Sequence, residues 1–172
     1  MKAIKIILGI IITLTVVFFA TGLLVKEINY EAKVEINKPL KEVFALFNDD
    51  DSLKKWVPDI KSIEVLEEKP GIIGSRYRMV VVDGNGNDIT MEEKVLAYIE
   101  NEKVTLYFDA QGMLKTDDYT FTSDGSKTII TNRSTCKSDS YIFGCMMPYF
   151  KGTFKDIDQG YLNNFKAFAE KQ

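Results

Sequence analysis

A run of 20 uncharged, mostly apolar residues near the start of the chain, residues 6–25, places the strongest constraint on how it folds. A helix of ~20 residues crosses the ~30 Å of hydrocarbon in a bilayer, so this run has the length of a membrane span. A cleaved signal peptide has a shorter apolar stretch of ~7–15 residues that ends in small side chains. Bulky residues fill the end of this run instead. We therefore expect residues 1–28 to form an uncleaved N-terminal membrane anchor.

Basic residues flank the apolar run unevenly. Lys2, Lys5 and the terminal amine form a positive cluster before it, whereas the segment that starts at Lys26 mixes acidic and basic residues. Short flanking segments rich in lysine and arginine stay on the cytoplasmic side of a membrane. We therefore expect a single-pass membrane protein with a cytoplasmic N-terminus and with residues 29–172 on the extracytoplasmic side.

The rest of the chain has the composition of one globular domain. The chain has 172 residues, is 45% hydrophobic and 27% charged, and contains no internal repeat, which suits one domain with a sizeable core. Residues 27–172 hold 19 of the 22 basic residues and all 25 acidic residues, which gives them a formal charge of −6. Nucleic-acid-binding proteins neutralise phosphates with basic patches. The balance argues against a nucleic-acid partner.

The absence of histidine narrows the chemistry. Without it, the chain has no Ser–His or Cys–His nucleophile, no histidine metal ligand and no imidazole switch. The sequence also has no P-loop, dinucleotide-binding fingerprint or zinc-ligand spacing. We expect no cofactor and no metal, and we assign no catalytic residue. The two cysteines, Cys136 and Cys145, form either a disulfide outside the cytoplasm or two half-buried free thiols.

Hydrophobic patterning predicts an α+β domain. Alternation over residues 29–37 indicates a half-buried strand. We expect a short helix whose first turn contains Pro39, and a second short helix that is capped within residues 50–52 and ends before Pro58. From residue 60, alternating segments separated by turns such as 84–87 predict about six antiparallel strands joined by hairpins.

The C-terminal segment has a helical period. We expect Pro148 to occupy the first helical position. Large apolar residues then recur at spacings of three and four: Phe150, Phe154, Ile157, Tyr161, Phe165 and Phe168. At 100° per residue these six lie within an arc of ~80°, and Asp158 is among the polar residues outside it. Such a helix needs a large apolar partner, and the concave face of the antiparallel sheet is the only candidate of that size.

The order of these elements resembles the helix-grip fold of the START-like (SRPBCC) superfamily, which includes Bet v 1 allergens, polyketide cyclases and CoxG-type proteins. The segments that carry the resemblance are Glu35-Ile36-Asn37-Lys38-Pro39-Leu40-Lys41-Glu42-Val43-Phe44, Trp56-Val57-Pro58, Gly71 with Gly74-Ser75, and Leu162-Asn163-Asn164-Phe165-Lys166 with Glu170. The resemblance covers nearly all of residues 29–172. An anchor directly before the domain is similar to a membrane-tethered bacterial subgroup.

The resemblance implies a cavity between the C-terminal helix and a curved sheet of about seven strands. Members of the superfamily bind sterols, lipids, aromatic polyketides or hormones there, and others are cyclases. The inward-facing candidates for lining such a cavity are Tyr77, Met79, Met91, Glu93, Leu106, Phe108, Tyr119, Phe121, Phe150, Phe154, Ile157 and Tyr161. The same side chains would also serve as a solid apolar core, which is the plain alternative.

Glu93 is the most informative single candidate. It shares strand parity with Met91 and Val95, which places it on the inner face, but a register slip of one residue would place it in water. A buried carboxyl would have a raised pKa and could act as an acid, a base or an anchor for a hydroxyl. Arg133 either pairs with a ligand carboxylate or with Glu93, or lies exposed, and Arg78 is expected to point outward.

Three functions fit these observations. The first is a membrane-tethered protein that binds a hydrophobic, lipid-like or aromatic small molecule, with the membrane contacted through residues 6–25. The second is a cyclase- or aromatase-like enzyme that uses tyrosine and glutamate groups. The third is an assembly factor with a filled core. An open apolar tunnel favours the first, an inward desolvated Glu93 beside a tyrosine favours the second, and a cavity volume near zero favours the third.

Overall fold

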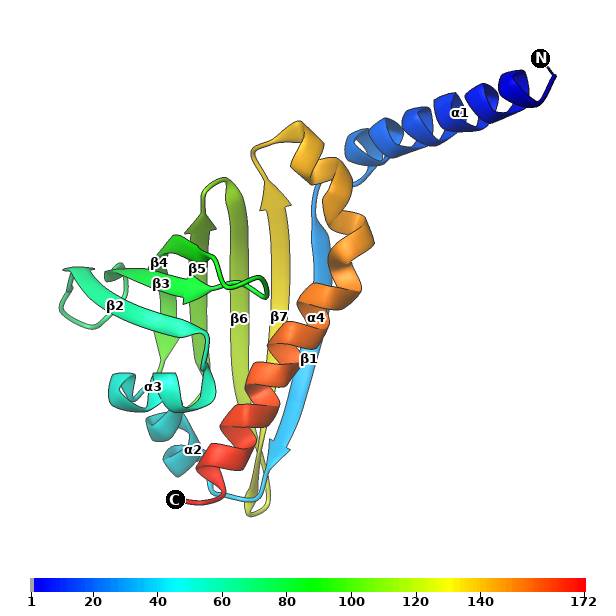
Figure 1. Ribbon diagram of the computed structural model, residues 1–172. Helices are drawn as coiled ribbons and strands as arrows, with labels where there is room; N and C mark the ends of the chain where they lie inside the picture. Colours follow the sequence, from blue (N-terminus) through cyan, green and yellow to red (C-terminus); the bar gives the residue numbers. More distant parts are fainter. Residues whose placement is uncertain (1) are drawn as a thin grey trace.

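The computed structural model, which describes residues 2–172, shows a curved antiparallel sheet with a long C-terminal helix across its concave side (Figure 1). The elements are α1 (Lys2–Leu24), β1 (Ile28–Ile36), α2 (Leu40–Phe47), α3 (Asp50–Trp56), β2 (Ile60–Glu67), β3 (Arg76–Val82), β4 (Asp88–Ile99), β5 (Lys103–Ala110), β6 (Met113–Asp124), β7 (Lys127–Ser138) and α4 (Tyr141–Ala169). This is the helix-grip arrangement that the sequence predicts, with the expected six strands after the short helices.

The sheet has the strand order β1-β7-β6-β5-β4-β3-β2, so each strand from β2 to β7 pairs with its neighbour along the chain and β1 closes the far edge against β7. α4 packs mainly on β1 and to a lesser extent on β7. The two short helices cover the end of the concave side where α4 finishes (Figure 1). The middle strands, β3 to β5, therefore receive less cover from helices than the β1 edge does.

The local sequence explains the first elements. Residues of β1 alternate between buried and exposed along its whole length, so the strand predicted at 29–37 is confirmed. Pro39 caps α2 from an extended conformation and lies just outside the helix rather than in its first turn. The cap of α3 is Asp49, one residue before the predicted range, because its side chain accepts a hydrogen bond from the backbone N–H of Asp51.

The predicted hairpin between β3 and β4 is confirmed. The Asp83 carboxylate accepts hydrogen bonds from the backbone N–H groups of Asn85 (2.9 Å) and Asn87 (2.8 Å). Gly86 has φ +85°, a left-handed conformation that costs glycine nothing. The short polar turn thereby fixes the β3–β4 register on which the position of Glu93 depends.

The start of α4 differs from the prediction. The helix begins at Tyr141 rather than at Pro148, and the Ser140 side chain caps it by accepting from Phe143 N–H. Pro148 lies inside the helix, where it removes one backbone donor. The sequence predicts a start at Pro148 because proline favours the first helical turn.

The buried face of α4 is also rotated from the predicted stripe. Its buried residues are Cys145, Met147, Asp158, Leu162, Phe165 and Ala169. Cys145 faces α1. At 100° per residue, the mean direction of the other buried residues is rotated by roughly 60° about the helix axis from the centre of the predicted stripe. Asp158, predicted to lie off the buried face, is therefore at its centre. The apolar stripe misled the prediction because the buried face includes a polar residue.

Aromatic side chains form the main core where α4, α2, α3 and the sheet meet. The Phe165 ring lies 5.3 Å from the Phe47 ring and 5.1 Å from the Trp56 ring, measured between centroids. Phe121 reaches the same cluster, 5.1 Å from Phe47. Edge-to-face contacts of this kind add to the stabilisation from burial alone. This cluster holds the C-terminal half of α4 against the sheet, as the sequence predicts.

α1 projects away from the domain (Figure 1). Among residues 2–172 it is the one helix that has the length and composition of a membrane span, although a signal sequence near an N-terminus has the same properties. Its last turns contact the start of α4, where Gly22 is buried. Both cysteines are free and buried, so of the two alternatives for Cys136 and Cys145 the structure has the free thiols.

Candidate functional site

The middle of the concave face carries half of the predicted ligand-contacting residues. Register places Tyr77 opposite Glu93, Met79 opposite Met91 and Glu93 opposite Phe108, so these side chains share one face of β3, β4 and β5. Leu106 lies on the same face. All except Met79 are half-buried rather than buried. Solvent therefore reaches an apolar stretch of the concave face that α4 does not fill.

Glu93 lies in this stretch with its side chain inward. Of the inward and the solvent-exposed positions considered from the sequence, the structure therefore has the inward one. Burial, together with the negative charges of Asp50 and Asp117, raises the pKa of its carboxyl to about 7. Burial and the nearby Asp50 also raise the pKa of Tyr77, which lies directly opposite Glu93. Near neutral pH the Glu93 carboxyl is therefore divided between its protonated and ionised forms.

A small pocket opens beside Glu93. Its volume is about 30 Å³, and its lining residues are Asp50, Leu53, Ile63, Tyr77, Met79 and Glu93. That volume holds on the order of one water molecule. The pocket lies between α3 and strands β2 to β4, so a larger guest requires α3 or the β2–β3 hairpin to move away from β4.

A charged cluster lies deeper on the same face, between β6 and α4. The Nζ atom of Lys115 is 2.9 Å from Oδ2 of Asp117 and 2.7 Å from Oδ1 of Asp158. Both aspartates are buried. Burial disfavours the lysine cation, but the two carboxylates outweigh that cost and hold the pKa of Lys115 well above its usual value. The cluster links α4 to the centre of the sheet through charge rather than through apolar contact.

The Ser134 hydroxyl lies between the two carboxyl groups of this cluster. Its Oγ atom lies 2.6 Å from Oδ1 of Asp117 and 2.9 Å from Oδ2 of Asp158. One hydroxyl hydrogen serves one carboxylate, so the second contact is favourable when the other carboxyl is protonated. Burial, together with the charge of Asp117, raises the pKa of Asp158, although the Lys115 cation opposes that effect.

Asn132 adds an unsatisfied amide next to the cluster. It is fully buried, and neither its Nδ2 nor its Oδ1 atom has a hydrogen-bond partner within the described residues. It lies opposite Tyr119 in the β6–β7 register and two residues before Ser134 on the same face of β7. Buried amides in proteins are almost always paired, so Asn132 has an unused donor and acceptor in the interior of the domain.

The remaining predicted residues lie elsewhere. Phe121 and Tyr119 contact Phe47 and belong to the aromatic core. Tyr161 donates a 2.8 Å hydrogen bond to Asp59 and ties α4 to the segment before β2.

On α4, Phe154 is half-buried beside Met147, whereas Phe150 and Ile157 are 47% and 45% exposed and lie outside the buried face. The rotation of α4 described above accounts for their exposure.

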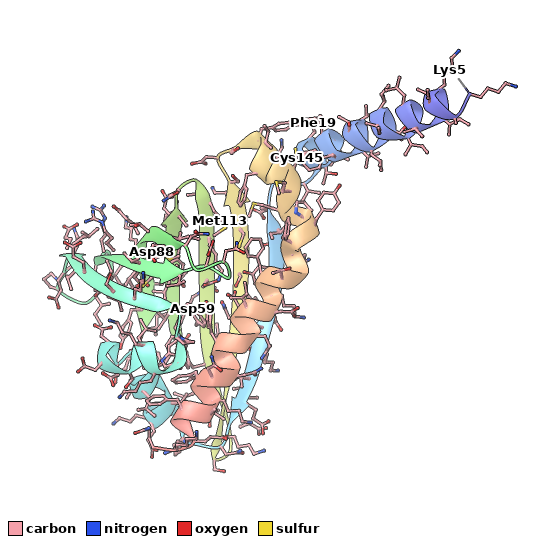
Figure 2. All side chains as sticks on the ribbon, viewed as in Figure 1. Lys5, Phe19, Asp59, Asp88, Met113 and Cys145 are labelled. Atoms are coloured by element: carbon pink, nitrogen blue, oxygen red, sulfur yellow. The ribbon has the colours of Figure 1, made fainter. Side chains whose placement is uncertain are left out.

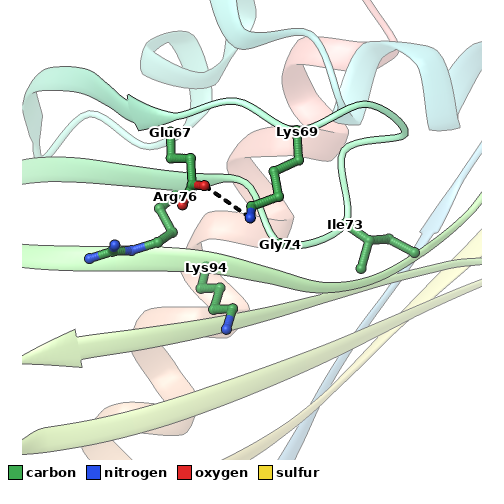
Figure 3. A pocket seen from close by; sticks show the side chains of 6 residues that line it. All are labelled: Glu67, Lys69, Ile73, Gly74, Arg76 and Lys94. Carbon is green, nitrogen blue, oxygen red and sulfur yellow. Dashed lines mark ion pairs between the residues drawn. The ribbon is translucent and has the colours of Figure 1, made fainter.

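The two arginines considered from the sequence do not reach the site. Arg133 is exposed and pairs with Glu31 at 3.1 Å, and Arg78 points outward to Glu64 at 3.0 Å, as expected. A larger depression, of about 540 Å³, also lies outside the concave face. Figure 3 shows its lining of Glu67, Lys69, Ile73, Gly74, Arg76 and Lys94 around the β2–β3 turn, with the Glu67–Lys69 ion pair across it. Its open, charged lining does not suit a hydrophobic guest.

The charged cluster was not among the residues predicted to form a site, although the sequence contains a signal for it. Lys115 and Asp117 alternate in phase with Met113, Tyr119 and Phe121, so the period of two that placed the apolar residues inward also places these two inward. Ser134 is likewise in phase with Cys136 on β7. Polar residues that alternate in phase with an apolar stripe therefore indicate polar groups on the inner face of the sheet.

Comparisons with solved structures agree with the fold. The Zhui aromatase/cyclase from Streptomyces sp. R1128 matches with a TM-score of 0.70 and 15% identity, over 84% of this chain and 94% of that chain. Ara h 8.0201 matches with a TM-score of 0.67 and 14% identity, over 85% and 99% of the two chains. The protein TTHA0849 from Thermus thermophilus matches with a TM-score of 0.67 and 18% identity, over 83% and 97%. At these identities the likeness concerns the fold alone.

Sequence comparison gives the family. None of the curated proteins matches the chain at a significant level. A family model described as polyketide cyclase / dehydrase and lipid transport matches residues 27–170, which is nearly the whole domain. The chain therefore belongs to the polyketide cyclase/dehydrase and lipid transport family.

Proposed function

We propose that this protein is a membrane-tethered binding protein that holds a hydrophobic small molecule with at least one polar group on its concave face. The observation that carries the proposal is the apolar stretch over β3 to β5, which stays half-accessible beside the inward Glu93. Binding sites for small molecules are mostly apolar concave surfaces with a few polar groups that fix orientation. The apolar side chains would hold the body of the guest, and Glu93 would bind its polar group.

The tether explains how such a guest would be reached. A hydrophobic compound partitions into the bilayer, and α1 would keep the domain beside that reservoir. The positive charges at Lys2 and Lys5 favour a cytoplasmic N-terminus and a domain on the opposite side. A C-terminal alkaline phosphatase fusion, which is active only outside the cytoplasm, tests this orientation. An inactive fusion together with a fluorescent C-terminal green fluorescent protein fusion would reverse it.

Native mass spectrometry of the detergent-extracted full chain tests the binding function. We expect a co-purifying hydrophobic compound, or uptake of a compound from a panel of lipids and aromatic molecules. Met91→Trp puts a bulky side chain on the concave face and should abolish the bound mass. The matched control is Leu96→Trp on the same strand, at a side chain that is 43% exposed, and it should retain the bound mass.

Two results would count against this proposal. Empty wild-type protein that also takes up no compound from the panel would favour an assembly factor with a filled core, a function that the small pocket of about 30 Å³ suits. Binding that Met91→Trp leaves unchanged would place the guest somewhere other than the concave face.

A second candidate function is proton-transfer catalysis of the cyclase type. The specific observation in its favour is that Glu93 has a pKa raised to about 7 and lies opposite Tyr77. A carboxyl with a pKa near the working pH exchanges protons efficiently. Under this function, compounds recovered after incubation with the wild type would lose the mass of water, while Glu93→Gln would bind them and return them unchanged. Unaltered compounds from the wild type would leave binding as the function.

A further inference from the structure

The junction between α1 and α4 constrains how deeply the domain approaches the bilayer. The Tyr141 hydroxyl donates a 2.6 Å hydrogen bond to the backbone carbonyl of Phe19. The Tyr149 hydroxyl lies 3.1 Å from Oγ1 of Thr21. Figure 2 shows Phe19 and Cys145 side by side where the two helices meet. The start of α4 is therefore attached to the last two turns of the apolar helix.

Aromatic stacking and close packing reinforce this attachment. The Phe19 and Tyr141 rings are nearly parallel with centroids 6.2 Å apart, and the Phe18 and Tyr149 rings are 6.4 Å apart. Gly22 is buried against Cys145, and a Cβ atom at Gly22 would clash with the Cys145 sulfur. The close approach of the two helices at this point therefore requires glycine.

The contacts are level with residues that must lie inside the membrane. Phe19 is six residues before Val25, or ~9 Å below the end of the apolar run at 1.5 Å per residue. If the start of α4 stayed in water, α1 would have to withdraw Phe19 and the residues after it. Only residues 6–18 would then remain in hydrocarbon, and these cover ~20 Å of the ~30 Å needed.

The surface at the start of α4 suits that depth. Large apolar side chains there are exposed on the side away from the sheet: Tyr141 (45%), Ile142 (61%), Phe143 (39%), Met146 (37%), Tyr149 (61%) and Phe150 (47%). Tyrosine is enriched where hydrocarbon meets headgroups, and apolar patches of this kind are costly in water. Lys151 follows directly and can reach lipid phosphates.

We propose that residues 141–150 of α4 are embedded in the interfacial layer of the bilayer and are held there by their packing against α1. This inference rests on the proposed tether and extends it. Besides being connected to α1, the domain contacts the lipid surface directly through the start of α4. Docking turns the end of the fold where Val25, Met113 and Met147 pack together towards the membrane.

Quenching by brominated lipids tests the depth of each element in the full chain, reconstituted in phosphatidylcholine vesicles. Three single variants carry a tryptophan at an exposed position: Leu14→Trp in the middle of α1, Ile142→Trp at the start of α4, and Val65→Trp on the distant β2. The native Trp56 is buried in the domain and gives the same background in all three. We expect Leu14→Trp to be quenched best by deep bromines, Ile142→Trp best by bromines near the headgroups, and Val65→Trp no more than the wild type.

The quenching results distinguish a failure of interfacial docking from a failure of the tether on which it rests. Quenching of Leu14→Trp without quenching of Ile142→Trp would overturn interfacial docking and leave the tether in place. Absence of quenching at Leu14→Trp would overturn the tether itself, and docking with it.

A glycine pair tests whether α1 holds α4 at this depth. In the Ile142→Trp background, Gly22→Leu should separate the two helices and remove most of the quenching. The matched control Gly9→Leu should retain it, because a Cβ atom at Gly9 meets no atom within 4 Å. Equal quenching in the two variants would overturn the role of the α1–α4 junction.

Discussion

Replacing Glu93 by glutamine should make the stability of the protein less dependent on pH. Folding raises the pKa of Glu93 from 4.5 to about 7, mainly through burial. The folded state therefore binds this proton more tightly than the unfolded state. The resulting stabilisation is fully present below the unfolded pKa and is lost as the pH rises through about 7. Glutamine keeps the size and polarity of the side chain but does not titrate.

The magnitude follows from the size of the shift. A shift of this size corresponds to about 3 kcal/mol, and partial access of solvent to Glu93 reduces the effect to about 1–3 kcal/mol. Between about pH 5 and about pH 8, the free energy of unfolding of the wild type should fall by that amount relative to Glu93→Gln. The difference between the two proteins isolates Glu93, since their other titrating groups are shared.

Urea unfolding in detergent micelles, followed by fluorescence, measures this difference. Trp56 is the only tryptophan and is buried against Phe165, so its emission reports on the loss of the core. Glu92→Gln is the control for loss of one charge on the same strand, because Glu92 points outward and pairs with Arg76 at 2.7 Å. If the unfolding free energies of the wild type and Glu93→Gln run parallel across the pH range, Glu93 is not desolvated and its inward placement is wrong.

Two further substitutions test the packing of α4. Lys115→Met leaves two buried aspartates without their cation and should lower the free energy of unfolding by about 3–5 kcal/mol. The control Lys127→Met removes the cation of an exposed pair and should change the free energy of unfolding little. Equal effects in urea unfolding would contradict the burial of the cluster. Phe165→Ala should lower the free energy of unfolding by about 3–5 kcal/mol and red-shift the tryptophan emission. Phe150→Ala, at an exposed site, should have a small effect on both. A larger loss of stability from Phe150→Ala would contradict the rotation of α4.

The order of elements could be predicted from the sequence because each has a strong local signal. The alternation of β1, the turn at 84–87 and the helical period of the C-terminal segment are set by residues close together in the chain. Strand parity also placed Tyr77, Met91 and Phe108 on one face, and register in the structure confirms it. Period-two patterns are reliable here because each hairpin fixes the phase of the next strand.

The face that α4 presents to the sheet could not be read from its own residues. An apolar stripe including Phe150 and Ile157 predicted one orientation, but the helix is rotated so that Asp158 points inward. What stabilises that rotation is Lys115, 43 residues earlier on β6. A buried carboxylate becomes tolerable only when a distant cation is brought against it, and local hydrophobicity carries no record of that partner.

Local sequence patterns are enough to predict the apolar N-terminal helix and the strand and helix order of a helix-grip fold. The rotation of α4, the charged cluster beneath it and the attachment of its first turns to α1 became visible only in the folded molecule. Strand alternation, turns and helical period arise between residues that are close together in the chain. The Lys115–Asp158 ion pair and the Tyr141–Phe19 hydrogen bond instead join distant segments that only folding brings together.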